Sequence, residues 1–263
     1  MATSGAANIA VTGSTGNIGG RVARALAAQG VPLRLVGRDP SRLPDLPGAV
    51  AGPAAEYAST DAMVAAIGDA HTLFLVSGRE SANRLAEHRS AVDAAVRAGV
   101  QRIVYLSFLG ASADCTFTFG RDHFHTEEHI RGSGLRHTFL RDSLYADFFA
   151  LMPGEDGVIR GPAADGRVSA VAQDDVADVA VAVLSDESGQ HDGVGYDLTG
   201  PEAFTLTEAA ARISAATGRD VRFEDETLEQ AYASRAHYGA PVRGRRLGDV
   251  VPGDRPRRAR EGQ

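Results

Sequence analysis

The chain of 263 residues contains no lysine, so all 27 of its basic residues are arginine. Without an ammonium side chain the protein lacks the residue needed for Schiff-base catalysis, for a phosphate-loop lysine and for a Tyr-x-x-x-Lys pair. Tryptophan is also absent, and Cys115 is the single cysteine. One cysteine excludes an internal disulfide framework and indicates a reducing compartment.

Long apolar runs and an excess of positive charge are missing as well. No run approaches the roughly 18 apolar residues that span a bilayer, and the N-terminal MATSGAAN lacks the basic and apolar regions of a secretory signal. The formal net charge of −7 gives no reason to expect a nucleic-acid partner. We therefore expect a cytoplasmic protein that binds neither nucleic acid nor a membrane, and a homodimer is left open.

Short apolar runs alternate with amphipathic stretches, and a hydrophobic share of 43% suffices for a sizeable core. Strands alternating with helices imply right-handed crossovers and a parallel sheet covered on both faces. The chain is thus predicted to adopt an α/β fold, a Rossmann doubly wound parallel sheet. The pattern predicts strands over residues 8–12, 33–36, 71–76, 102–107 and 136–140, and helices over 19–29, 61–67, 84–98 and 123–131.

The later part of the chain is less regular. Thr207 is the predicted N-cap of a helix that ends at Gly218. The stretch 237–263 is rich in proline, glycine and arginine, which predicts an irregular tail, either solvated or serving as a basic arm for an acidic partner. Further helices or strands are predicted over residues 174–184, 195–199, 207–217 and 221–224.

The first predicted strand runs into the glycine loop TGSTGNIGG, whose spacing is G-x-x-G-x-x-G. Gly13 permits a tight turn, Gly16 lets the backbone approach a pyrophosphate, and Gly19 lets the helix pack against the strand. Free N–H groups and the helix dipole at the start of that helix favour negative charge. The loop therefore predicts a dinucleotide site formed by Gly13, Ser14, Thr15, Gly16, Asn17, Ile18 and Gly19.

The end of the second strand bears on the choice between NADP and NAD. An acidic residue there would accept a hydrogen bond from the ribose 2′-hydroxyl, whereas an arginine would pair with a 2′-phosphate. Arg38 comes first and Asp39 follows it. We expect NADP, with NAD as the alternative.

Two further strand ends are expected to face the cofactor, because ligands bind outside the carboxyl ends of parallel strands. Val76, Ser77 and Gly78 follow one strand, and Ser107 and Phe108 end another. Each serine has a simpler explanation as a helix cap. We nevertheless assign Val76, Ser77, Gly78 and Ser107 to the cofactor site, and Phe108 to the substrate site.

A family pattern is visible in the segments TGSTGNIGG, VGRDPSRL, LFLVSG, HRSAVDAAVRAGVQRIVYLS, SGLRHTFLRDSLYADFF and GYDLTGPEAFTLTEAA. In this order they resemble the NmrA-like atypical short-chain dehydrogenase/reductases. Within that family they are most similar to the NAD(P)H:quinone oxidoreductase branch. The resemblance implies a dinucleotide-binding domain over residues 1–150, to which about 168–200 also contributes. A smaller α/β substrate domain is then expected over 151–236, before the tail of 237–263.

The resemblance also implies roles for single residues. A lysine that holds the nicotinamide ribose in the quinone reductase branch is replaced here by Glu128, which would place a carboxylate near the cofactor. The segment after the strand over 136–140 corresponds to the substrate mouth, where Tyr145 would orient a quinone or donate a proton. The expected aromatic wall for a planar aromatic substrate comprises Phe108, Phe117, Phe119, Phe148 and Phe149.

Three histidines lie in the predicted helix over 123–131. His125 and His129 are four residues apart, a spacing that can bind zinc, but no clear third ligand accompanies them and we expect no metal. His123 or His125 is a candidate proton donor because histidine titrates near neutral pH. The catalytic candidates are thus Tyr145 and His123.

These features predict an NAD(P)H-dependent oxidoreductase that reduces a quinone-like or polycyclic aromatic substrate. One alternative is a non-catalytic NmrA-type sensor, whose dinucleotide occupancy regulates a protein partner. Another is a tailoring oxidoreductase or oxygenase of aromatic polyketide antibiotic biosynthesis.

Overall fold

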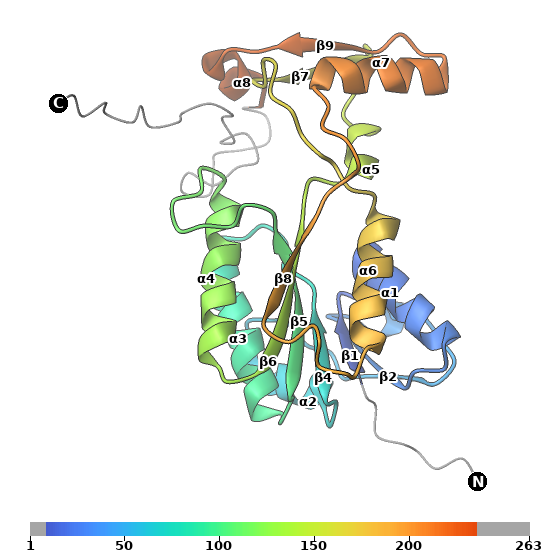
Figure 1. Ribbon diagram of the computed structural model, residues 1–263, viewed down its shortest axis with the longest axis vertical. Helices are drawn as coiled ribbons and strands as arrows, with labels where there is room; N and C mark the ends of the chain where they lie inside the picture. Colours follow the sequence, from blue (N-terminus) through green and yellow to red (C-terminus); the bar gives the residue numbers. More distant parts are fainter. Residues whose placement is uncertain (1–8, 236–263) are drawn as a thin grey trace, which may run out of the picture.

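The computed structural model describes residues 9–235 (Figure 1). Its main feature is a seven-stranded sheet in the order β3-β2-β1-β4-β5-β6-β8, in which every neighbouring pair of strands is parallel. The strands are β1 (Ile9–Thr12), β2 (Leu33–Val36), β3 (Ala49–Ala51), β4 (Thr72–Leu75), β5 (Arg102–Phe108), β6 (Arg136–Asp142) and β8 (Val194–Leu198). This arrangement confirms the predicted Rossmann-like α/β fold.

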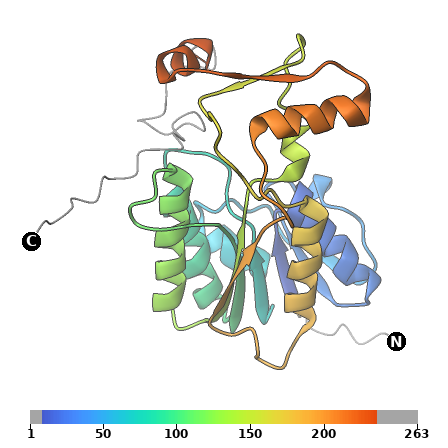
Figure 2. The same cartoon turned by 45° about the horizontal axis from the view of Figure 1, so that its top comes forward.

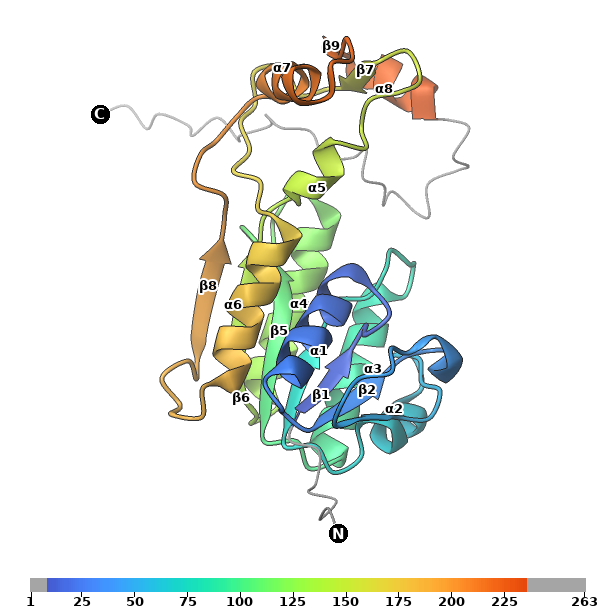
Figure 3. The ribbon, with the colours of Figure 1, turned by 90° about the vertical axis from the view of Figure 1, so that its right-hand side faces the viewer.

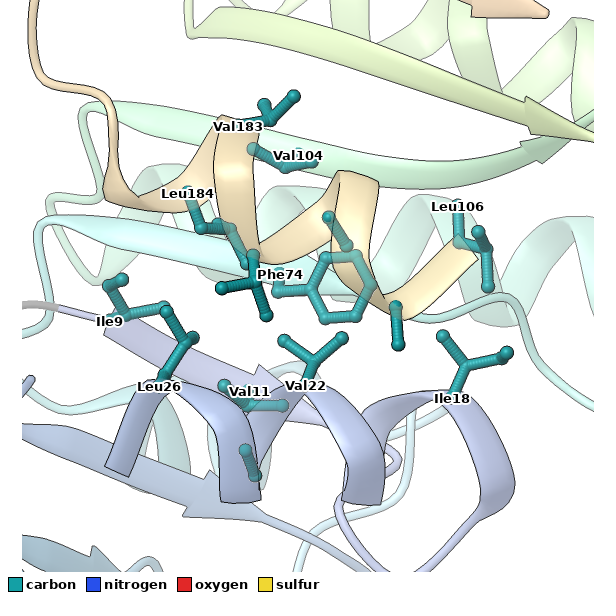
Figure 4. Close-up of a cluster of buried hydrophobic side chains, with 14 of the residues drawn as sticks. Ile9, Val11, Ile18, Val22, Leu26, Phe74, Val104, Leu106, Val183 and Leu184 are labelled. Atoms are coloured by element: carbon teal, nitrogen blue, oxygen red, sulfur yellow. The ribbon is translucent and has the colours of Figure 1, made fainter. Parts of the chain in front are cut away.

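Helices cover both faces of the sheet (Figures 1 and 3). One face carries α1 (Asn17–Ala28) and α6 (Gln173–Ser185), and the other carries α2 (Thr60–Ile67), α3 (Arg84–Arg97) and α4 (Thr118–Gly132). Apolar residues recur along α1 at helical spacing, which gives the helix one buried face. Figure 4 shows that face packed against β1, β4 and α6 through Val11, Val22, Leu26, Phe74 and Leu184.

A smaller part of the chain lies beyond the carboxyl ends of the main strands (Figures 1 and 2). It has its own parallel pair of strands and a small core that includes Ile159, Ala210 and Val221. The chain enters this smaller part after β6 and then returns to the main sheet, where α6 packs on α1 and β8 pairs with β6. After β8 it enters the smaller part a second time. The smaller part contains α5 (Ala146–Phe149), β7 (Val158–Gly161), α7 (Leu206–Thr217), β9 (Arg222–Asp225) and α8 (Leu228–Arg235).

Most predicted elements are present, with shifted ends. Thr207 is not the N-cap of α7: that role belongs to Thr205, which forms a reciprocal capping box with Glu208. Gly218 ends the helix in a left-handed conformation, as predicted. The tail of 237–263 lies outside the described residues. Within residues 9–235 no helix is long and apolar enough to cross a membrane.

Candidate cofactor and substrate site

The glycine loop connects β1 to α1 at the carboxyl edge of the sheet. Gly13 has a φ of +62°, a backbone conformation that side-chain-bearing residues rarely adopt. At Gly19 a Cβ atom would lie 2.4 Å from the Gly13 carbonyl oxygen and 2.5 Å from that of Thr12. The tight turn at Gly13 and the close helix–strand approach at Gly19 are therefore both present, as the spacing predicted.

The start of α1 suits an anionic ligand. Gly16 is its N-cap and supplies no side-chain hydrogen bond, and the first turn carries no acidic residue. The first N–H groups of a helix have no intrahelical partner, and here no side chain of the loop occupies them. Thr15, Gly16 and Asn17 are exposed, whereas Ser14 is buried and its hydroxyl donates to the Val11 carbonyl at 2.7 Å. The residues present therefore fit a dinucleotide diphosphate.

Arg38 and Asp39 follow β2 and have different surroundings. The Asp39 carboxylate accepts hydrogen bonds from the Ser41 hydroxyl at 2.6 Å and the Ser41 N–H at 3.0 Å. These bonds hold the pKa of Asp39 below its ordinary value. Arg38 is exposed, and no contact within the described residues engages its guanidinium group. Asp39 thus serves a local turn, while Arg38 is available to an anion.

The loop after β4 is fixed by two side chains of α3. The Gly78 N–H donates to Nε2 of His88 at 2.8 Å, and Nε of Arg84 donates to the Gly78 carbonyl at 2.9 Å. Both backbone groups of Gly78 are therefore bonded to buried side chains. A Cβ atom at Gly78 would lie 3.3 Å from His88 Nε2, which leaves little room for a side chain on that side.

His123 belongs to the same buried network. Its Nε2 lies 3.0 Å from an Arg84 nitrogen and its Nδ1 lies 2.8 Å from the Tyr105 hydroxyl. Because arginine only donates, Nε2 of His123 accepts and Nδ1 carries the proton. Burial and the neighbouring Arg84 lower the pKa of His123 well below its ordinary value and that of His88 to about 3. Both rings are neutral, and His123 directs its N–H toward Tyr105.

Ser107 belongs to a second buried polar network, which lies between the sheet and α4 and includes Glu127 and Arg141. Its hydroxyl donates to Glu127 at 2.7 Å, and Arg141 binds the same carboxylate through two nitrogens at 2.9 and 2.7 Å. Burial raises the pKa of Glu127, but the bonds from Arg141 and Ser107 prevail and hold it below the ordinary value. Glu127 is thus a buried carboxylate whose charge is matched by arginine.

The expectation that Glu128 places a carboxylate near the cofactor is wrong. Its side chain is 53% exposed and pairs with Arg131 on the outer surface of α4. Adjacent residues of a helix point about 100° apart, so Glu127 faces the sheet while Glu128 faces solvent. One turn before Glu127, the same inward face carries His123.

The aromatic residues divide into two groups. Phe108 and Phe117 have ring centroids 5.0 Å apart, and Phe119 lies 5.2 Å from Phe117, so these three form one cluster where β5 ends and α4 begins. Phe149 is instead buried in the smaller part of the chain, 5.3 Å from the ring of Phe204. Phe148, its neighbour on α5, is 49% exposed.

Tyr145 directly precedes α5, and its hydroxyl lies 2.5 Å from Oδ2 of Asp142 at the end of β6. Its ring packs against the large core cluster between the sheet and helices α1 and α6. Burial raises the pKa of Asp142 to about 7, and burial together with Asp142 raises that of Tyr145. The pair therefore lies at the carboxyl end of β6, on the same edge of the sheet as the glycine loop.

His125 and His129 do not converge on a shared ligand. Nε2 of His129 lies 2.7 Å from Oδ1 of Asp93, and His125 contacts the ring of Phe124. No group of three or more metal-ligating side chains occurs in residues 9–235.

Arg84, His88, Glu127 and Asp142 were not predicted from the sequence as site residues. A signal existed for the first two: Arg84 and His88 share a helix face with Ala91, Val92 and Ala95, so polar residues occupy core-facing positions. Such positions indicate a buried polar network. No comparable pattern marks Asp142.

Comparison with known proteins agrees with this geometry. A family model described as NAD(P)H-binding matches residues 13–187. The chain is 31% identical to quinone oxidoreductase 2 of Escherichia coli and 30% identical to an NAD(P)H azoreductase of Xenophilus azovorans. Each match covers 89% of this chain and 82% of the relative. The crystal structure of the NADPH-dependent quinone oxidoreductase of E. coli in complex with NADPH matches with a TM-score of 0.79 and 30% identity, over 89% of this chain and 83% of the other.

The fold, the glycine loop and these relatives define an NAD(P)-dependent oxidoreductase. The chain belongs to the NAD(P)H-binding family, and the predicted membership of its NmrA-like atypical short-chain dehydrogenase/reductase group, near the quinone oxidoreductase branch, is confirmed.

Proposed function

We propose that this protein uses NADPH to reduce a quinone-like or polycyclic aromatic acceptor. The observation that carries the proposal is the aromatic cluster of Phe108, Phe117 and Phe119 where β5 ends. The Phe119 ring lies 5.0 Å from the guanidinium group of Arg84, which binds the Gly78 carbonyl in the loop assigned to the dinucleotide. Flat apolar rings bind flat apolar rings through stacked or edge-to-face contacts. The named activities of the relatives, a quinone oxidoreductase and an azoreductase, also concern planar conjugated acceptors.

Different residues of the chain would bind different parts of NADPH. The first N–H groups of α1, at Asn17 and Ile18, would hold the diphosphate, and Arg38 would pair with the 2′-phosphate of NADPH. The bonds from Arg84 and His88 hold the Gly78 peptide in place. When bound, the reduced nicotinamide supplies a hydride. Placement of the acceptor is the main contribution of the protein, because quinones are intrinsically easy to reduce.

Preference for NADPH over NADH rests on Arg38. Its guanidinium group is exposed and unengaged within the described residues, whereas Asp39 is bonded to Ser41. The two bonds from Ser41 engage Oδ1 of Asp39 and fix that carboxylate in the turn after β2, so the proposed preference depends on the positive charge of Arg38.

The test is oxidation of NADPH by purified protein, followed at the absorbance of the reduced nicotinamide, with a panel of benzoquinones, naphthoquinones, azo dyes and polycyclic quinones under nitrogen. We expect turnover with at least one planar acceptor and a lower rate with NADH. Tight NADPH binding without turnover across the panel would contradict the proposal and favour a dinucleotide sensor. Glu128 itself gives no support to the sensor alternative, because its side chain is exposed on the outer surface of α4.

A further inference from the structure

Asp142 is a buried acid with few partners. Its residue is 5% exposed, and its side chain has one side-chain hydrogen-bond partner, the Tyr145 hydroxyl. Burial of a carboxylate is costly unless a cation or several donors compensate the charge. Glu127 shows the usual solution in this protein, since it is held by two arginines and a serine. Asp142 lacks that compensation, although the preceding residue of strand β6 is Arg141.

The charged groups around Asp142 do not change this picture. Arg141 points to the opposite face of the sheet, toward Glu127, and the residues opposite Asp142 on the neighbouring strands are Phe108 and Leu198. On the α1 and α6 side, Arg21 is paired with Asp174. Asp147, on α5, acts on Tyr145 as a second negative charge. Among residues 9–235 no cation therefore stabilises the ionised form of Asp142, and its pKa is raised to about 7.

The charge of Asp142 decides where the Tyr145 hydrogen points. Ionised Asp142 only accepts, so it binds the hydrogen of the Tyr145 hydroxyl. Protonated Asp142 can donate its own hydrogen to the Tyr145 oxygen across the same 2.5 Å, and the tyrosine hydrogen is then released for another acceptor. Tyr145 directly follows the carboxyl end of β6, the edge of the sheet that also carries the glycine loop and the Phe108–Phe117 pair, so in this proposal its hydrogen is available at the edge where cofactor and acceptor would bind.

We propose that Asp142 holds the proton that Tyr145 passes to the reduced acceptor, so that the charge of Asp142 gates turnover. This inference rests on the proposed function. Asp142 acts through Tyr145 and is a positioning residue, because its carboxyl group does not itself touch the acceptor.

The step balances for a quinone. Uptake of one hydride, with its electron pair, from the reduced nicotinamide converts the quinone to a hydroquinone monoanion. The O–H bond of Tyr145 then breaks as its proton bonds to the acceptor oxygen, and the O–H bond of Asp142 breaks as its proton bonds to the tyrosine oxygen. Tyr145 ends unchanged, and Asp142 ends as a carboxylate that takes a proton from water before the next turnover.

A first experiment measures the protonation state of Asp142 in the absence of turnover. Infrared difference spectra of the unliganded protein, wild type minus Asp142→Asn, are recorded between pH 4 and pH 9. We expect the C=O band of a protonated carboxyl group to persist to about pH 7 and then disappear. Loss of that band near the ordinary aspartate pKa of about 4 would overturn the proposal.

A second experiment tests the proton relay, that is, transfer of the Asp142 proton through Tyr145 to the acceptor. Wild-type kcat at saturating NADPH and acceptor should fall about tenfold per pH unit above pH 7, as Asp142 loses its proton. Asp142→Asn keeps an acceptor for the Tyr145 hydroxyl but cannot hold an acidic proton. It should therefore show a pH-independent kcat, lower by about 100-fold at pH 6, with an unchanged KM for NADPH. Tyr145→Phe should show the same flat, low profile if Asp142→Asn does not fold.

The control is Asp197→Asn, an exposed carboxylate on the neighbouring strand β8, which should keep the wild-type profile. A wild-type profile in Asp142→Asn, with turnover intact, would overturn the relay alone. Absence of turnover by the wild type with every acceptor would overturn the proposed function together with the delivery step, and the infrared titration would then report only on the charge of Asp142.

Discussion

The backbone N–H of Gly78 donates a hydrogen bond of 2.8 Å to Nε2 of His88. That single contact sets the tautomer of the histidine, because an accepting Nε2 requires the proton on Nδ1. Nδ1 lies 3.0 Å from the Thr126 hydroxyl, which itself donates to a backbone carbonyl of α4. A loop assigned to the cofactor is thereby connected, through one neutral ring, to the interior between α3 and α4.

Replacing His88 by alanine should weaken NADPH binding more than it slows the chemical step. The Gly78 N–H would lose its partner, and the loop after β4 would lose one of its two attachments to α3. A lost buried hydrogen bond costs about 1–3 kcal/mol, so we expect the Kd for NADPH, measured by fluorescence titration, to rise about tenfold. His129→Ala, at a solvent-facing site on α4, is the control and should leave the Kd unchanged. An unaltered Kd in the His88 variant would show that the loop does not need this attachment.

Acid should destabilise the folded protein through the same histidine. Burial and Arg84 lower the pKa of His88 to about 3, from 6.5 in the unfolded chain. The unfolded state therefore binds more protons at acid pH, and the free energy of unfolding falls as the pH drops below 6.5 toward 3. At pH 5.5 the loss from this group is about 1.4 kcal/mol. Urea denaturation at pH 7.5 and pH 5.5 measures it, and the difference should be smaller in His88→Asn, which has no ring to protonate.

Gly19→Ala should damage both folding and cofactor binding. The added methyl group would lie within 2.4–2.6 Å of backbone atoms of Gly13 and Thr12, which cannot move without separating α1 from β1. We expect a loss of about 3 kcal/mol or more in unfolding free energy and no measurable NADPH affinity. Gly132→Ala is a matched control in α4, since a Cβ there meets nothing within 4 Å. That control should be neutral or stabilise by up to about 1 kcal/mol. A Gly19 variant as stable as the control would contradict the close approach.

Arg38→Ala should shift the cofactor preference toward NADH. A charge-assisted hydrogen bond to a phosphate contributes about 1.5–3 kcal/mol, so kcat/KM for NADPH should fall about 10- to 100-fold while that for NADH changes little. Arg42→Ala removes an equal charge from the adjacent turn and serves as the control. Equal losses for the two cofactors would mean that Arg38 does not distinguish them.

Glu127 and Glu128 should respond differently to the same substitution. Glu127→Ala leaves Arg141 without its bidentate partner at a site where the carboxylate is 1% exposed, and we expect a loss of about 3 kcal/mol in unfolding free energy. Glu128→Ala removes an exposed pair with Arg131 and should cost less than about 1 kcal/mol, with no change in NADPH affinity. Urea denaturation and NADPH titration of both variants test this difference. Tighter NADPH binding in Glu128→Ala alone would show that the Glu128 carboxylate does lie near the cofactor.

Patterns local to the chain predicted much of the fold. Apolar periodicity located the strands next to the cofactor, and β2 has the predicted limits of Leu33–Val36. The pattern missed β3 (Ala49–Ala51), because an edge strand of small residues has neither strong alternation nor strong β propensity. It also placed the start of α4 too late, since Gly120 interrupts the periodicity. In the folded chain Gly120 packs closely on Cys115, where a Cβ would lie 2.6 Å from the sulfur atom.

The sequence by itself determined the geometry of the glycine loop, because Gly13 and Gly19 satisfy steric demands that arise within one strand–loop–helix unit. The tertiary structure alone decided which acidic residues are buried and what compensates them. Glu127 and Glu128 are equivalent in sequence, but the orientation of α4 turns only Glu127 toward Arg141. The raised pKa of Asp142 likewise depends on burial by elements far apart in the chain. Desolvation is a property of the assembled fold, so no local pattern could report it.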